Sequence, residues 1–220
     1  MKIVFAHSVF NRLMTLKNTV SIEKKYFPDA NVSIAYNGLF INVFSEMSGI
    51  SFTHYGEDAH KIGALNGCIL SIKKLLDYDF DVLIFSHDDV FINEHYFDVV
   101  KKHINSIVNN DYDVICRKPM NVVKSVDLFG GYYSFEVFYI SKSAAIKLFS
   151  EHPTYKDEQE IPKDFRNIIS PEVWFYQLIA NKNLKINNIE FQVSVPYNNN
   201  LMGTQMGFYH KNADIRSWTE

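Results

Sequence analysis

Residues 81–93 read Asp-Val-Leu-Ile-Phe-Ser-His-Asp-Asp-Val-Phe-Ile-Asn, and this stretch decides the fold. Its apolar part, Val82 to Phe85, is unbroken, which predicts a strand buried on both faces of a sheet. Asp88 and Asp89 follow at the carboxyl end of that strand, where open α/β sheets bind their ligands. Two adjacent carboxylates there either hold a hard divalent cation together with a phosphate or cap the next turn, and the stretch alone does not decide between the two.

Strand and helix patterns alternate through the first half of the chain. Short apolar strand patterns lie at residues 2–6, 32–36, 50–54 and 113–116. Helical patterns, with apolar residues every three or four positions, lie at residues 13–26, 60–76 and 96–108. This βαβαβ order predicts an α/β fold with a mostly parallel central sheet and helices on both faces.

The second half of the chain is less regular. Residues 129–140 are rich in glycine and aromatic residues and should be extended, and Ser141 should cap a helix that follows it. Residues 154–167 form a charged segment, which predicts a loop or flap. Pro171 suits the first position of a further helix, and residues 198–200, all asparagine, predict a polar turn. Because no repeat or linker stands out, we expect a single domain over 1–220.

The composition limits the kind of protein. With 220 residues, 47% of them hydrophobic, the chain can bury a sizeable core. A formal net charge of −3 argues against general nucleic-acid binding. Cys68 and Cys116 lie in apolar runs, which predicts two buried free thiols and a reducing compartment. No apolar stretch is long enough to span a bilayer. We therefore expect a cytoplasmic protein, with peripheral association at the inner face of the membrane left open.

Four stretches resemble one enzyme family. Residues 7–12 (His-Ser-Val-Phe-Asn-Arg), 63–69 (Gly-Ala-Leu-Asn-Gly-Cys-Ile), 85–93 and 171–174 (Pro-Glu-Val-Trp) are similar to segments of the nucleotide-sugar-dependent glycosyltransferases of the GT-A fold. Residues 85–93 resemble the Asp-x-Asp segment, especially the form found in β-1,3-galactosyltransferase-like members. The chain departs from that pattern at His87, which stands where the family has its first aspartate.

The resemblance implies a GT-A-like (Rossmann-like) fold and a metal site. The nucleotide-binding half would be about residues 1–118, and the acceptor and catalytic half about residues 119–220. Asp89, Asp88 and His210 would bind Mn²⁺ or Mg²⁺, and His87 could also bind Mn²⁺. The ion would neutralise the charge that gathers on the departing diphosphate. Alternatively, His210 is a surface histidine of a C-terminal loop.

The resemblance also implies a donor site for a nucleotide sugar, with a UDP-sugar as the first choice. Its candidate residues are His7, Asn11, Arg12, Asn37, Asn66, His87, Asp88 and Lys211. Several have simpler interpretations. Asn11 or Arg12 could cap the helix predicted to follow, and Asn37 could form a turn with Gly38.

For the acceptor side, the resemblance implies that Glu172 is the catalytic base. A carboxylate must take the proton of the acceptor hydroxyl in an inverting transfer. Glu172 could instead only complement the dipole of its helix, and Asp157, Glu158 and Glu160 are further candidate carboxylates. Gly131 and Tyr132 would contact the acceptor. Trp174 could line the same site or belong to the core.

Together these features predict a hexosyltransferase-like enzyme of glycan biosynthesis, which moves a sugar from a nucleoside-diphosphate donor to a hydroxyl of a glycan or similar small acceptor. Two other functions fit the same residues. One is a metal-dependent nucleotidyltransferase, although no Gly-rich basic loop follows the first strand. The other is a non-catalytic protein that binds nucleotide sugars or glycans, for which His87 is the best argument.

Overall fold

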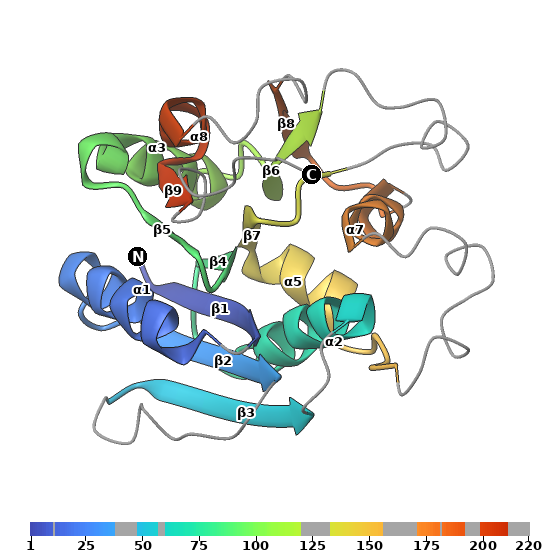
Figure 1. Ribbon diagram of the computed structural model, residues 1–220. Coiled ribbons are helices and arrows are strands. Elements are labelled where there is room, and N and C mark those ends of the chain that lie inside the picture. The colour runs from blue at the N-terminus through green and yellow to red at the C-terminus, as the bar shows by residue number, and fades with distance from the viewer. Residues whose placement is uncertain are drawn as a thin grey trace, which may run out of the picture.

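The computed structural model describes residues 1–10, 12–37, 48–56, 60–119, 133–155, 171–180, 182–191 and 199–210. These residues form a central sheet with helices on both faces (Figure 1). The sheet has seven strands in the order β3 (Ile50–Gly56), β2 (Asn31–Asn37), β1 (Ile3–Phe10), β4 (Val82–His87), β7 (Val137–Ser141), β6 (Val114–Pro119) and β8 (Ile186–Phe191). All neighbouring pairs are parallel except those of β7, which runs antiparallel to both β4 and β6. The predicted mostly parallel α/β sheet is confirmed.

The apolar run of β4 divides its side chains between two cores. Val82 and Ile84 pack with apolar side chains of α1 (Leu13–Tyr26), α3 (Phe97–Val108) and α8 (Asn199–Met206). Leu83 and Phe85 pack on the other face with those of α2 (His60–Lys73), α5 (Lys142–Phe149) and α7 (Pro171–Ala180). Because all four side chains are fully buried, each contributes about 1.5–3 kcal/mol of burial free energy. A polar side chain at any of these positions would be buried without access to water.

Two predicted helices begin where their capping residues indicated. The helix predicted over residues 13–26 is α1, with the same bounds. The Ser141 hydroxyl accepts a hydrogen bond from the Ala144 backbone N–H at 3.3 Å, so the predicted N-cap of α5 is confirmed. Cys68 and Cys116 are buried free thiols, as predicted.

The polar turn predicted at residues 198–200 is wrong in part, because Asn199 begins helix α8. Met202 and Met206 of α8 are buried in the core with α3, and this packing outweighs the turn preference of asparagine. Gly203 lets α8 pack closely against Tyr96, because a Cβ atom at this position would lie 2.2 Å from the Tyr96 ring. Among the described helices, none is both long and apolar enough to cross a membrane.

A second, smaller sheet completes the fold next to the end of β4. The three-residue strand β5 (Val90–Ile92) pairs antiparallel with β9 (Phe208–His210). A 3-10 turn, η1 (Glu94–Tyr96), joins β5 to α3 and is capped by the Asn93 side chain. The sequence patterns did not indicate β5, β8 or β9. This sheet brings the C-terminal part of the described chain beside the residues that follow β4.

Candidate active site at the carboxyl end of β4

Asp88 and Asp89 form a turn between β4 and β5, which we call the acidic turn. It lies at the carboxyl end of a central strand, the edge where α/β sheets bind ligands. In the small sheet, Val90 is the register partner of His210. The C-terminal strand therefore places the backbone of His210 beside the acidic turn, whereas the side chain of His210 lies outside the described residues.

Both carboxylates of the acidic turn are buried. Asp88 is 7% exposed and Asp89 is 5% exposed. Within the described residues, Asp88 Oδ2 accepts no hydrogen bond. Burial, together with the neighbouring charge of Asp89, raises the pKa of Asp88 from 3.8 to about 7, and the Arg12 charge opposes this rise. A buried carboxylate oxygen without a donor is costly to ionise, and a bound cation would remove that cost.

Arg12 forms an ion pair with the acidic turn. Its Nη1 donates to Asp89 Oδ2 at 2.5 Å. Of the two capping alternatives, Arg12 takes the N-cap position of α1 with its main chain, because its carbonyl accepts from the Leu16 N–H at 3.0 Å. Its side chain makes no capping hydrogen bond and reaches Asp89 instead. Asn11 lies outside the described residues.

His7, predicted to contact the nucleotide, lies in the interior with no exposed surface. Its Nε2 lies 2.9 Å from Glu23 Oε2, and its Nδ1 lies 3.1 Å from Ser86 Oγ. Both ring nitrogens are therefore engaged inside the protein, and this arrangement gives His7 no direct contact with a ligand. Its contact with Ser86 indicates that His7 stabilises β4, the strand that leads to the acidic turn.

Thr19 and Glu23 are supporting residues that sequence reasoning missed. The Thr19 hydroxyl donates to the carbonyl oxygen of Asp88 at 3.3 Å, and Glu23 pairs with His7. Burial raises the pKa of Glu23, and His7 opposes this rise. The two residues stand four positions apart on the buried face of α1. A pair of polar residues at that spacing within an apolar stripe could have indicated this supporting role from the sequence.

Two asparagines of the predicted donor site are buried. Asn37, at the end of β2, is 2% exposed and hydrogen-bonds to the Tyr55 side chain, whose pKa burial raises to about 12. Asn66 on α2 binds the main chain of Tyr155: its Nδ2 donates to the carbonyl at 2.6 Å, and its Oδ1 accepts from the N–H at 2.8 Å. Asn66 therefore fastens the segment after α5 to α2.

Glu172 and Trp174 lie at the start of α7, as their motif indicated. Glu172 is in the first turn, directly after Pro171. Its carbonyl accepts from the Tyr133 N–H at 3.3 Å, which ties α7 to the segment that leads into β7. Trp174 is 4% exposed and packs edge-on against the Phe135 ring, in agreement with its core alternative. Gly131, Tyr132 and Lys211 lie outside the described residues, as do the carboxylates Asp157, Glu158 and Glu160.

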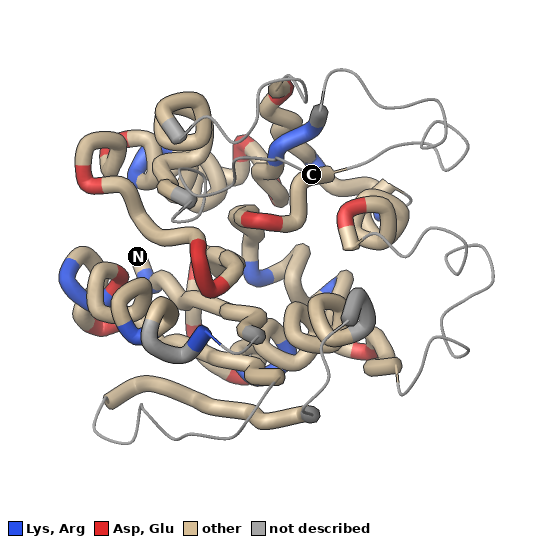
Figure 2. Tube along the Cα trace, viewed as in Figure 1, with Lys and Arg blue, Asp and Glu red and all other residues tan. Residues whose placement is uncertain are grey.

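Glu136 is a further carboxylate at this edge, which the sequence patterns did not indicate. The His87 N–H donates to the Glu136 carbonyl at 3.0 Å. Its carboxylate Oε2 accepts from Arg117 Nη1 at 3.3 Å and from Ser134 Oγ at 3.2 Å. Because β7 runs antiparallel to β4, the residue that enters β7 lies beside the end of β4. Figure 2 shows acidic positions where β4 ends, where β7 begins and at the start of α7.

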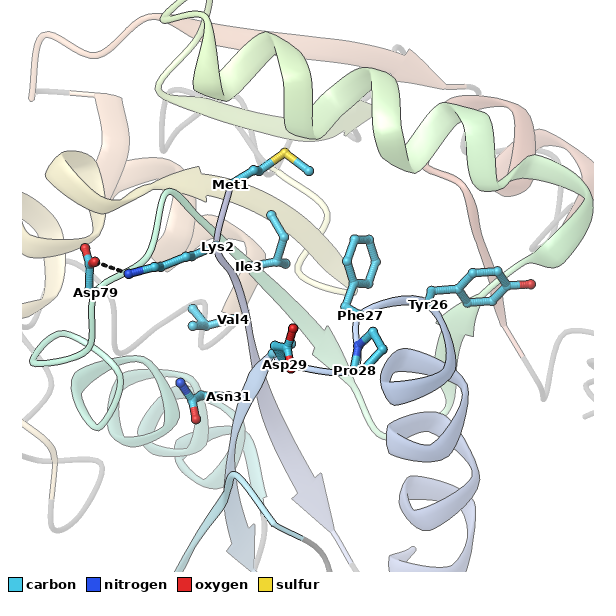
Figure 3. Close-up of a pocket in the computed structure, with 11 residues that line it drawn as sticks. Met1, Lys2, Ile3, Val4, Tyr26, Phe27, Pro28, Asp29, Asn31 and Asp79 are labelled. Carbon is cyan, nitrogen blue, oxygen red and sulfur yellow. Dashed lines mark hydrogen bonds and ion pairs between the residues drawn. The ribbon is translucent and has the colours of Figure 1, made fainter.

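A hollow of about 590 Å³ lies at the opposite edge of the sheet (Figure 3). It is lined by the start of β1, the segment between α1 and β2, and Asp79. Lys2 and Asp79, which lie at its border, form an ion pair with each other. Since this is the amino-terminal end of the parallel strands, the hollow is separate from the acidic turn. We assign the candidate site to the carboxyl edge.

No family model matches the sequence, and no curated protein gives a significant match. Solved structures match the fold. An active-site mutant of LgtC has a TM-score of 0.53 at 12% identity, over 96% of this chain and 86% of that chain. The galactosyltransferase LgtC in complex with donor and acceptor sugar analogs has a TM-score of 0.51 at 14% identity, over 86% and 73%. TarS from S. aureus has a TM-score of 0.52 at 11% identity, over 86% and 58%. These likenesses establish the fold, and the GT-A-like prediction is confirmed.

Proposed function

We propose that the protein is a glycosyltransferase, which moves a sugar from a nucleoside-diphosphate donor to a hydroxyl of a glycan or similar small acceptor. The observation that carries this proposal is the buried acidic turn at the carboxyl end of β4, where Asp88 Oδ2 accepts no hydrogen bond from any described residue. The fold, which LgtC shares, supports the general class. A UDP-sugar is the first donor to test.

Asp88, Asp89 and His210 are the residues that would hold Mn²⁺ or Mg²⁺. The carboxylate oxygens of the acidic turn are the ligands that such hard ions prefer, and the register of β5 and β9 supports His210 as the third ligand. The described side chains alone contain no group of three His, Cys, Asp or Glu residues placed to bind a metal. When bound, the ion supplies positive charge where the leaving diphosphate becomes negative.

Glu172 is the proposed base for the acceptor hydroxyl. It lies in the first turn of α7, at the helix end where the dipole is positive. Glu136 is the second carboxylate at the same edge, but Arg117 and Ser134 hold its Oε2. We therefore propose that Glu136 positions His87 and that Glu172 takes the proton.

A thermal-shift screen tests the donor assignment. Nucleotide sugars of UDP, GDP, CMP and TDP are added with and without Mn²⁺ to the wild type and to Asp89→Ala. A donor at 100 times its dissociation constant should stabilise the fold by about 2.7 kcal/mol. A metal-dependent shift with one donor, lost in Asp89→Ala, supports the proposal. A cooperative melt that no donor shifts counts against it.

A non-catalytic nucleotide-sugar-binding protein is the second candidate. The observation that favours it is His87, which stands where the resemblance expects an aspartate. A binding protein should show the same thermal shift but should not consume the donor. Glu172→Gln should then leave the thermal shift unchanged. Measurement of nucleoside diphosphate release separates the two functions.

A further inference from the structure

We infer that Arg12 binds the diphosphate of the donor and leaves Asp89 to do so. The diphosphate then replaces Asp89 as the partner of Arg12, and the metal replaces Arg12 as the partner of Asp89. This inference rests on the proposed function and adds an order to its binding steps. It assigns Arg12 a positioning role in the donor site. Three features of Arg12 support this role: the unfavourable place of its charge, its exposure, and its competition with a metal ion for Asp89.

The charge of Arg12 stands where a cation needs a nearby anion. Arg12 is the N-cap residue of the 14-residue helix α1, and no acidic residue occupies the first turn of that helix. The positive end of the helix dipole disfavours a guanidinium at this place. Asp89, 77 positions further along the chain, supplies the compensating charge in the structure. A diphosphate at this edge would supply more negative charge to the same group.

The Arg12 side chain is open to a second partner. It is 42% exposed, whereas the Asp89 side chain is 7% exposed. A guanidinium carries five N–H donors, and the hydrogen bond to Asp89 uses Nη1. The fork of N–H groups also suits two phosphate oxygens at once. An anion that arrives from solvent therefore meets the exposed part of Arg12 before it meets the buried carboxylates.

Arg12 and a metal ion compete for Asp89. The ion pair occupies Asp89 Oδ2, the carboxylate that the proposed function gives to the metal. Without nucleotide, Arg12 should therefore weaken metal binding. A diphosphate that draws Arg12 away frees Asp89, and by linkage the two ligands then raise each other's affinity. Removal of the Arg12 charge should consequently have opposite effects on the two ligands when each is added alone.

Isothermal titration of Arg12→Gln tests the inference. Mn²⁺ is titrated without nucleotide, and UDP and pyrophosphate are titrated separately in EDTA. We expect Mn²⁺ to bind about tenfold more tightly and UDP and pyrophosphate about tenfold more weakly than in the wild type, the change expected for one charge-assisted hydrogen bond. Arg12→Lys keeps the charge but lacks the fork of donors, and its affinities should lie between those of the wild type and Arg12→Gln.

Lys25→Gln is the matched control, because Lys25 also lies on α1 and also pairs with an acid, Glu94, but with 62% and 58% of the two side chains exposed. It should change neither affinity. If Arg12→Gln weakens both ligands, or leaves either unchanged, the exchange is refuted while the proposed function stands. If the wild type binds neither UDP nor pyrophosphate, the inference fails, and the proposed function fails as well if none of the four classes of nucleotide sugar gives a thermal shift.

Discussion

His7→Leu should destabilise the protein severely, because it leaves a buried acid without its partner. His7 and Glu23 have no exposed surface, and Nε2 and Oε2 lie 2.9 Å apart. Among the described residues, Glu23 Oε1 already accepts no hydrogen bond. Removing the partner of a buried, hydrogen-bonded acid leaves that acid uncompensated, which costs about 3–5 kcal/mol. That is a large part of the roughly 5–15 kcal/mol that stabilises a typical domain.

The double variant His7→Leu/Glu23→Leu should recover most of the lost free energy, because apolar side chains of similar volume replace both polar groups. The cycle of single and double variants, measured by urea unfolding at pH 7, should give a coupling energy of at least about 2 kcal/mol. In His7→Leu the loss should grow with pH. Burial raises the pKa of Glu23, so its stability contribution is present at low pH and is lost as the acid ionises.

The exposed pair Lys25–Glu94 provides the control cycle, with an expected coupling below about 1 kcal/mol. Additive effects of the two interior substitutions would show that His7 and Glu23 are not coupled. A His7→Leu variant that unfolds at the same urea concentration as the wild type but loses nucleotide binding would contradict the prediction, because that result would return His7 to the donor site.

Two further substitutions test the acidic turn and a helix cap. Burial raises the pKa of Asp88 from 3.8 to about 7, so in the wild type a contribution of up to about 4 kcal/mol is present below pH 4 and is lost as the pH rises through 7. Asp88→Asn should remove this dependence and be the more stable protein at pH 8 in EDTA, by urea unfolding; parallel pH profiles would contradict this. Ser141→Ala removes the hydroxyl that caps α5 and should cost about 1 kcal/mol, a fall of about 2–4 °C in melting temperature. An unchanged melting temperature would show that the cap contributes nothing.

The parts of the fold with strong local patterns could be predicted from the sequence. The apolar run Val82 to Phe85 gave the central strand, because burial on both faces requires apolar residues at every position. The apolar stripe of α1 gave that helix with its bounds. The strands β5 and β9 could not be found in this way, since three residues show no periodicity and their pairing joins segments more than 100 positions apart.

The location of the candidate site at the end of a strand could be predicted from the sequence, whereas the side-chain contacts within the site could not. The position of Asp88 and Asp89 follows from local sequence, whereas the ion pair of Arg12 with Asp89 depends on how α1 packs. His7 and Asn66 are polar residues inside regular elements, and the sequence does not say whether such a residue faces a ligand or an internal partner. Glu136 was missed because only the antiparallel direction of β7 brings it beside His87.

Release of nucleoside diphosphate would show whether the protein transfers sugar. The donor identified by thermal shift is incubated with Mn²⁺ and a panel of glycan acceptors, and the diphosphate released is measured for the wild type, Asp89→Ala and Glu172→Gln. We expect acceptor-dependent release by the wild type and loss of release in Asp89→Ala. We also expect loss of release in Glu172→Gln, with the donor-induced thermal shift retained. Donor binding without release in the wild type, unchanged in Glu172→Gln, would contradict catalysis and identify a binding protein.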